Sequence, residues 1–169
     1  GKILAEWIRD RQVPADLPGL EVRRMHPVQG TREYLRERTA ETLGLLYAMH
    51  WPHRQYDTAR QVRRSPFHER LLAAGACMGE AGAWERPNWF GEPGSQPAYE
   101  YSWGLQNWAD NARSEAAAVR DSVALFDQSS MAKFIVQGRD AVTVLNRLST
   151  ANLDVAPGRI VYCQWLNPK

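Results

Sequence analysis

Apolar side chains recur at intervals of three and four along the first residues of the chain. Over residues 3–8 the isoleucine, leucine and tryptophan positions fall on one face of a helix, and the charged positions fall mostly on the others. This spacing predicts an amphipathic helix. We expect Pro14 and Pro18 to end it. The proline- and glycine-rich stretch 13–30 then predicts an extended connector.

Two further helices are predicted in the next part of the chain. Residues 31–49 alternate leucine and tyrosine with charges, which predicts a second amphipathic helix with Gly44 as its weak point. A third, short helix has clear signals at both ends. Ser65 suits the N-cap, Pro66 suits the first helical position, and Gly75 suits the C-terminal stop.

The segment 76–108 is rich in glycine, proline and aromatic residues. This composition favours short strands and ordered loops over helix. Two interpretations of its aromatic rings stay open. The rings pack against the surface of another domain, or they form a small local core.

The pattern changes near residue 110. Residues 114–121 have strong helix propensity, and a second helix is predicted over 140–148. Apolar runs predict strands at 134–136 and 160–166. This mixture of elements predicts an α+β fold.

Composition and charge exclude some classes of protein. With 44% hydrophobic and 24% charged residues, the 169-residue chain has the composition of a soluble globular protein. Its net charge of +2 is too small and too evenly spread for a nucleic-acid surface. No apolar run approaches the roughly 20 residues of a membrane span. We therefore expect neither nucleic acid nor membrane as a partner.

Few residues suggest chemistry by themselves. Cys77 and Cys163 lie far apart, which favours reduced, buried thiols over a disulfide or a metal site. His50 and His53 are three apart, but Pro52 intervenes and no third ligand follows. We expect them to cap or pack, and we expect no metal.

Three arginines lie just before the short third helix, at Arg60, Arg63 and Arg64. They are able to hold an anion or a carboxylate. A solvated or interdomain basic face is the interpretation that the sequence favours.

Both ends of the chain predict missing sequence. Gly1 leads directly into helix without a methionine or a capping residue. The strand predicted over 160–166 has no returning strand after it. We therefore expect this chain to be an internal piece of a longer one.

Longer strings resemble the sarcosine and dimethylglycine dehydrogenase family, in that family's order. GKILAEWI at residues 1–8 is similar to the helix that closes its flavin domain, and RRSP (63–66) and GAWERPNWF (82–90) are similar to its central region. The strings LFDQSSMAK (125–133), VQGRDA (136–141) and GRIVY (158–162) resemble the opening of a folate-binding aminomethyltransferase fold.

The resemblance implies a protein with two chemistries. A flavin domain with FAD takes a hydride from the N-methyl carbon of sarcosine or dimethylglycine, and tetrahydrofolate captures the one-carbon unit. The reactive iminium has to be kept from water before capture. The expected partners are a small methylated glycine substrate and the missing flavin and folate portions of the same polypeptide.

The resemblance also assigns site residues. Gly1 and Lys2 match the FAD side, and Met131 and Tyr162 match positions that line the folate pocket. For Met131 and Tyr162 an ordinary core role stays open. The family's flavin contacts and catalytic aspartate match no residue from Gly1 to Lys169, so we expect no catalytic residue here and no activity of the isolated chain.

The predicted division is 1–25 as the end of the FAD-dependent domain, 26–110 as a central connecting region, and 111–169 as the first part of the folate-binding domain. A bacterial cytoplasm or a mitochondrial matrix suits this family. Two alternatives stay open. One is a non-catalytic connector between domains, and the other is an aminomethyltransferase of the glycine-cleavage type without a flavin domain.

Overall fold

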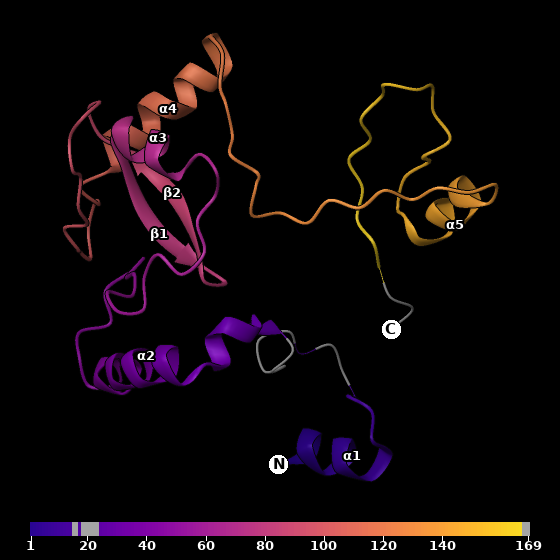
Figure 1. The fold of residues 1–169 in the computed structure, drawn as a ribbon, viewed down its shortest axis with the longest axis horizontal. Coiled ribbons are helices and arrows are strands. Elements are labelled where there is room, and N and C mark those ends of the chain that lie inside the picture. The colour runs from indigo at the N-terminus through magenta and orange to yellow at the C-terminus, as the bar shows by residue number, and fades with distance from the viewer. Residues whose placement is uncertain (15–16, 18–23, 167–169) are drawn as a thin grey trace. The chain divides into compact units, whose positions relative to one another are not determined.

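The computed structural model describes residues 1–14, 17 and 24–166 (Figure 1). The chain divides into two compact units, one made of Gly1–Pro18 with Ala132–Lys169 and the other of Gly19–Met131. Residues 15–16 and 18–23 of the predicted connector over 13–30 lie outside the described residues.

The first helix, α1, spans Lys2–Asp10, as its apolar spacing predicts. It ends at Arg11, whose backbone is left-handed with φ 53°, and so stops before Pro14. None of its residues is buried, and Ile8 is 78% exposed. The apolar face is therefore present but uncovered.

In the second unit a 3-10 turn, η2 (Pro27–Gly30), leads into α2 (Arg32–Leu45). The helix stops short of the predicted end at Met49. Gly44 weakens its last turn, and the His50 ring nitrogen lies 3.0 Å from the Leu45 carbonyl oxygen, where it caps the helix.

The short helix α3 spans His68–Ala73. It begins later than predicted because the Ser65 carbonyl first accepts the His68 N–H in a turn. Gly75, with φ +86°, ends it as predicted. A Cβ at Gly75 would lie 2.4 Å from the Glu92 carbonyl oxygen, so both the backbone angle and the space require glycine.

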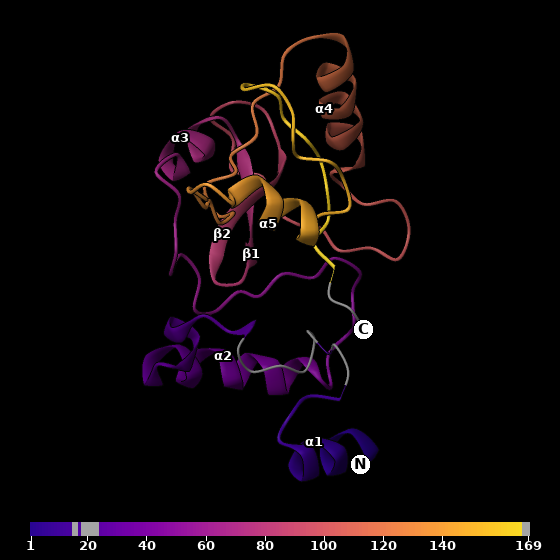
Figure 2. The same ribbon diagram turned by 90° about the vertical axis from the view of Figure 1, so that its right-hand side faces the viewer.

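The predicted strands form an antiparallel hairpin of β1 (Ala76–Ala81) and β2 (Trp84–Phe90), with a register shift between Cys77 and Met78. Helix α4 (Ala109–Asp121) follows the loop after β2 and begins five residues before the predicted 114. Figures 1 and 2 show α3 and α4 beside the hairpin, and α3 contacts both strands while α4 contacts β2. The hairpin is the centre of this unit.

The core of the second unit is small and contains polar groups. Among the described residues the buried apolar side chains are Tyr34, Ala76, Cys77, Ala83 and Trp89. Buried polar or charged residues are as numerous and comprise Gln29, Arg38, Ser65, His68 and Glu85. Such groups require internal hydrogen bonds and ion pairs, which fix the position of one element on another.

Residues 132–166 of the other unit contain one helix, α5 (Ala141–Leu148), which matches the prediction. The predicted strands at 134–136 and 160–166 are wrong. A single bridge joins Ser149 to Trp165, and Ile135 and Ile160 are 87% and 99% exposed. A strand is stabilised by a neighbouring strand, and among the described residues only this isolated bridge pairs with either run.

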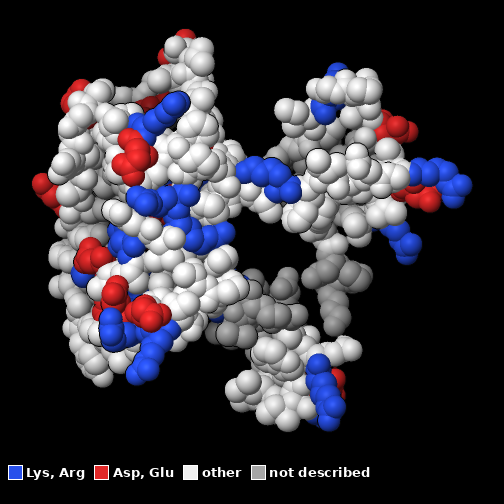
Figure 3. Space-filling view, in the orientation of Figure 1, with Lys and Arg blue, Asp and Glu red and all other residues white. Residues whose placement is uncertain are grey.

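The mixed helix and strand content confirms the α+β fold class. Lys and Arg side chains alternate with Asp and Glu over the face shown in Figure 3. Within the described ranges, no helix is long and apolar enough to cross a membrane.

Candidate functional site

The predicted FAD-side residues lie at the start of α1. Gly1 has open space around it and occupies the N-cap position without a side-chain hydrogen bond. The Lys2 ammonium lies 3.9 Å from the Glu6 carboxylate and its side chain is 87% exposed. Both residues are accessible, and their assignment to FAD stays a prediction.

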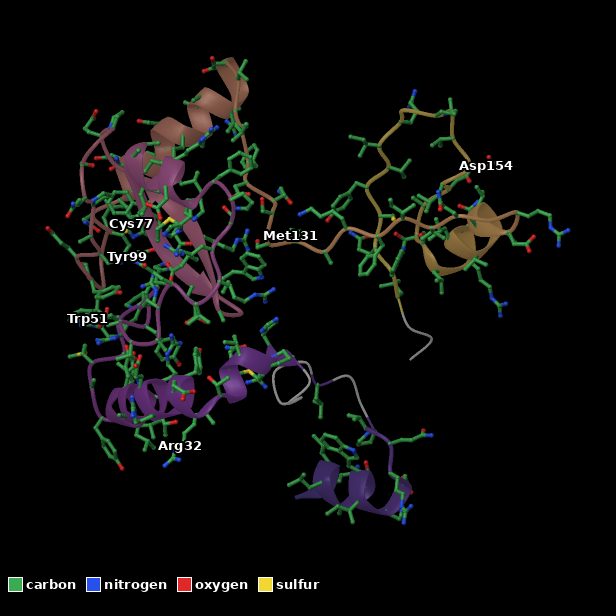
Figure 4. All side chains as sticks on the ribbon, in the orientation of Figure 1. Arg32, Trp51, Cys77, Tyr99, Met131 and Asp154 are labelled. Carbon is green, nitrogen blue, oxygen red and sulfur yellow. The ribbon has the colours of Figure 1, made fainter. Side chains whose placement is uncertain are left out.

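The predicted folate-side residues fall in different units. Met131 closes the second unit, on the segment labelled in Figure 4, and is 46% exposed. Tyr162 belongs to the other unit and is 86% exposed. Neither is a core residue of its own unit, so the alternative core role finds no support, and the folate assignment stays a prediction.

A hydrogen bond joins the start of the second half of the chain to residues before α3. The Ser65 hydroxyl lies 2.5 Å from one Asp127 carboxylate oxygen, and the other oxygen accepts the Ser129 N–H at 2.9 Å. Ser65 also accepts the Phe67 N–H at 3.2 Å. Asp127 is thereby held against the turn that opens α3, although the two partners lie 62 positions apart.

A cavity of about 380 Å³ lies between β2, α4 and residues 124–128. Its apolar wall includes Phe90, Leu125 and Phe126, and Arg86 and Glu115 are its charged lining residues apart from Asp127. Glu115 accepts the Phe90 N–H at 2.8 Å, which ties α4 to the end of β2. The cavity thus combines an apolar wall with one cation and two carboxylates.

A buried ion pair of the unit joins Arg60 to Glu85 on β2. Arg60 donates to both Glu85 oxygens, at 2.8 and 2.6 Å, and the Gln61 N–H donates to the same carboxylate at 2.7 Å. The Glu85 side chain is 1% exposed. Burial alone would raise the pKa of Glu85, but these hydrogen bonds outweigh it and hold the pKa below its ordinary value.

A second pair joins α2 to β1. The Arg38 guanidinium lies 2.6 Å from Glu80, donates to the Thr58 carbonyl at 2.7 Å, and lies over the Tyr34 and Tyr56 rings. The ring centroids are 5.1 and 4.1 Å from its central carbon. This one side chain therefore fixes α2 against the hairpin.

The expectation of a solvated or interdomain arginine face fits Arg64 but not Arg60, which holds a carboxylate as the alternative interpretation allowed. Arg60 is paired with buried Glu85, Arg63 lies 4.2 Å over the Trp84 ring, and Arg64 lies 3.3 Å from Glu69. Sequence reasoning missed these partners because they follow later in the chain. Arg60 and Arg63 join segments of the unit, whereas the Arg64 pair lies at the surface.

The two histidines behave as expected. His50 caps α2, and the His53 ring packs edge-on against Trp108 with centroids 5.4 Å apart. Over the described part of the chain, no cluster of His, Cys, Asp and Glu could hold a metal ion.

The two thiols differ in their surroundings. Cys77 and Cys163 are both free. Cys77 is buried, and burial raises the pKa of its thiol. Cys163 is half-buried, so the prediction that both are buried holds for Cys77 alone.

The tryptophans divide between the two interpretations of segment 76–108. Trp89 is 5% exposed and belongs to the core of the unit, while Trp103 is 64% exposed. Trp103 packs on Trp51 with centroids 5.6 Å apart. The segment therefore forms part of a local core and also presents an aromatic surface.

Comparison with known families gives two matches that follow each other along the chain. Residues 12–65 match the FAD dependent oxidoreductase central domain, and residues 67–169 match the GCVT N-terminal domain. The matches meet at Pro66, between Ser65 and the start of α3. The predicted division into 1–25, 26–110 and 111–169 stays a prediction.

The chain is similar over its whole length to curated proteins. It is 47% identical over 169 residues, 100% of its length, to 4-methylaminobutanoate oxidase (formaldehyde-forming) of Paenarthrobacter nicotinovorans, of which it covers 20%. It is 31% identical over 99% of its length to the mitochondrial sarcosine dehydrogenase of Homo sapiens, of which it covers 21%.

A third relative is not named as an oxidoreductase. The chain is 34% identical over 99% of its length to the mitochondrial pyruvate dehydrogenase phosphatase regulatory subunit of Mus musculus, of which it covers 20%. The chain thus spans about a fifth of the length of each of these relatives.

Proposed function

Because the chain belongs to the GCVT N-terminal domain family and carries an FAD dependent oxidoreductase central domain ahead of it, we propose that it is part of an FAD-dependent enzyme that demethylates N-methylated amino acids. The proposed substrates are sarcosine or dimethylglycine, and the proposed acceptor of the one-carbon unit is tetrahydrofolate. When bound, FAD supplies a two-electron acceptor and tetrahydrofolate supplies a nucleophile.

The observation that carries the proposal is the pairing of the two family matches in one chain. A flavin-dependent demethylation releases a one-carbon unit, and a folate-binding domain is suited to receive it. The Ser65–Asp127 hydrogen bond supports this interpretation, because it links the end of the first match to a residue inside the second. We propose that this contact helps to keep the two parts in a constant relation.

The cavity beside residues 124–128 suits a folate in its chemistry. Phe126 and Leu125 offer a flat apolar surface to a pterin, and Arg86 offers a cation to an acidic tail. We propose that these residues, with Met131 and Tyr162, contribute to the folate side of the complete protein. Gly1 and Lys2 are proposed for its FAD side.

The first test is anaerobic reduction of the flavin in the purified polypeptide that carries this chain. Addition of sarcosine, dimethylglycine or 4-methylaminobutanoate should bleach the flavin absorbance with one of the three. The chain of 169 residues, supplied with FAD, should not bleach it with any. If none of these amines reduces the flavin of the complete polypeptide, demethylation is the wrong activity.

The second test separates folate transfer from simple release of formaldehyde. The relative from Paenarthrobacter nicotinovorans is named formaldehyde-forming, so release of formaldehyde has to be distinguished from transfer to folate. With tetrahydrofolate present, methylenetetrahydrofolate should accumulate and free formaldehyde should fall. Formaldehyde release that tetrahydrofolate leaves unchanged would remove the transfer step and keep the oxidation.

A non-catalytic connector is the second candidate. Two observations favour it: the exposed aromatic and apolar residues Trp103 and Leu105, at 64% and 70%, and a relative that is named a regulatory subunit. Replacement of Trp103 by serine in the complete polypeptide would then lower the yield of assembled protein without changing turnover per bound flavin. The third candidate, an aminomethyltransferase without a flavin domain, is disfavoured by the match over residues 12–65.

We also propose a location in a bacterial cytoplasm or a mitochondrial matrix. The support is that one relative comes from a bacterium and two are named as mitochondrial. The proposed partners are the flavin and folate portions of the same polypeptide and a small methylated amine.

A further inference from the structure

An exposed aromatic surface lies where the segment after α2 meets the loop between β2 and α4, and we call it the Trp51–Trp103 surface. The rings of Trp51 and Trp103 pack with centroids 5.6 Å apart. The Gln55 N–H donates to the Tyr101 hydroxyl at 2.9 Å and so ties the same two segments together. Figure 4 labels Trp51 on the segment that follows α2. Gln55 and Tyr101 are 46 positions apart, so the surface exists only in the folded unit.

A tight turn presents the most exposed part of this surface. Trp103 and Leu105 are 64% and 70% exposed. The Gln106 side-chain amide donates to the Ser102 carbonyl at 2.6 Å and to the Gly104 carbonyl at 3.1 Å. These hydrogen bonds fix the turn between them. A surface that is ordered in advance loses little conformational entropy when it binds a partner.

A cavity of about 240 Å³ adjoins the aromatic pair, since Trp51 belongs to both. Leu45, Met49, Trp51 and Tyr56 form its largely apolar wall. Arg54 is the one Lys or Arg among the lining residues, and none of them is Asp or Glu. The cavity therefore offers an apolar space with a single guanidinium and no carboxylate.

The Arg54 guanidinium has no counter-charge among the described residues. Its contact there is with the Tyr101 ring, whose centroid is 5.9 Å from its central carbon, and it forms no hydrogen bond or ion pair within the same ranges. Arg54 is half-buried, and of its nitrogens only Nε is a buried atom without a partner. The two Nη groups thus stay accessible. A carboxylate placed against them would form charge-assisted hydrogen bonds.

The extent of the exposed surface favours a polypeptide over a small molecule as the occupant. Trp103 and Leu105 do not line the cavity, so a small carboxylate held there would leave both uncovered. Tryptophan, methionine and arginine are enriched where proteins meet. A segment with an Asp or Glu next to an apolar side chain would pair with Arg54 and also fill the cavity.

Charge argues against a second copy of this chain as the occupant. A symmetric contact places the same surface on both copies. It would bring one Arg54 toward the other, and the cavity has no carboxylate to compensate either of them. Like charges that face each other are unfavourable at an interface.

We propose that the Trp51–Trp103 surface docks an acidic segment of the same polypeptide outside residues 1–169, with a carboxylate on Arg54 and an apolar side chain in the cavity. The relatives hold most of their length outside the part that this chain matches, and a tethered segment binds at a high effective concentration. This choice of source rests on the proposed function, whereas the surface and its uncompensated cation are independent of it.

The first test locates the carboxylate. In the complete polypeptide, Arg54→Lys places an amine where the guanidinium was. A carbodiimide should condense this amine with the docked carboxylate, and peptide mass spectrometry should find the coupled Asp or Glu outside residues 1–169 of the same polypeptide. The matched control is Arg70→Lys on α3, an exposed position away from the surface, which should not couple to that carboxylate.

The second test asks whether the surface is covered. Leu105→Cys replaces a side chain that is 70% exposed in this unit. In the complete polypeptide its thiol should react at least about tenfold more slowly in the native protein than in the same variant unfolded in urea. Added Arg54→Glu should restore most of the reactivity, because it sets like charges against each other. Added Arg54→Lys or Arg70→Glu should leave the protection in place.

Three results would overturn the inference. They are a Leu105→Cys thiol that reacts as fast in the native protein as in urea, protection that Arg54→Glu leaves unchanged, and coupling of Arg54→Lys to a second copy or a separate protein. Flavin reduction in a polypeptide whose surface is open would refute the docking and keep the proposed function. A protected surface without flavin reduction would keep the docking and refute that function.

Discussion

Replacement of Glu85 by alanine tests whether the buried ion pair holds the second unit together. The variant removes a carboxylate that is 1% exposed and that accepts two hydrogen bonds from Arg60 and one from the Gln61 N–H. The Arg60 side chain, 22% exposed, would keep its contacts with the Tyr56 and Met78 carbonyls but lose its counter-charge. A buried cation would then be left poorly compensated.

Loss of one partner from a buried pair typically costs about 3–5 kcal/mol. Because Arg60 retains some contact with water, we expect a value near the lower end, about 3 kcal/mol. Domains usually have a total free energy of unfolding of about 5–15 kcal/mol, so this loss is a large share. With a urea slope of roughly 2 kcal/mol per molar, the midpoint should fall by about 1.5 M.

The matched control is the exposed pair of Arg64 and Glu69, whose side chains are 50% and 77% exposed. Glu69→Ala should change the free energy of unfolding by less than about 1 kcal/mol. A double-mutant cycle with Arg60→Met should recover part of the loss, since it removes the uncompensated charge. Equal effects of Glu85→Ala and Glu69→Ala would refute the reasoning.

Three further predictions concern the same unit. Folding lowers the pKa of Glu85 from its ordinary value of about 4.5. The Glu85 carboxylate therefore contributes fully to stability above about pH 4.5, and this contribution is lost as the pH falls through the lower pKa of the folded protein. Urea midpoints measured across the acid range should decline less steeply in Glu85→Gln than in the unaltered protein. In Gly75→Ala the new Cβ would lie 2.4 Å from a carbonyl oxygen at φ +86°, whereas in Gly82→Ala, at φ +59°, it would enter open space. We expect the free energy of unfolding to fall by at least about 2 kcal/mol in Gly75→Ala and by about 1 kcal/mol in Gly82→Ala, measured through the melting temperatures. Equal melting temperatures of the two variants would contradict the clash at Gly75. Ser65→Ala removes a hydrogen bond to the Asp127 carboxylate and should lower the free energy of unfolding by about 1.5–3 kcal/mol. Amide hydrogen exchange in residues 125–131 should become faster. Unchanged exchange would show that this hydrogen bond does not anchor the segment.

Local patterns predicted most of the helices because a helix is stabilised by contacts three and four residues apart. Residues 2–10 and 141–148 form helices where the spacing places them. The ends were less predictable. Helix α2 stops at Leu45 because His50 caps it, a contact that depends on how the following loop turns back.

Strands were less predictable than helices, because a strand needs a partner that the sequence does not specify. Residues 76–90 form short strands, as their composition predicts, and these strands pair because a short turn brings them together. The runs at 134–136 and 160–166 have equally suitable side chains but form no regular strand. The β propensity of a segment is expressed only where a neighbouring strand supplies hydrogen bonds.

The sequence by itself determined the order of the helices, the presence of short strands within 76–108 and the family resemblance, since each depends on residues that are close together in the chain. Only the tertiary structure decided the partners of the arginines and the contact of Ser65 with Asp127. Arg60 and Glu85 lie 25 positions apart in the sequence, and Ser65 and Asp127 lie 62 positions apart. The physical reason is that a side chain shows its charge and its hydrogen-bonding groups in the sequence, whereas its partner depends on the path of the folded backbone.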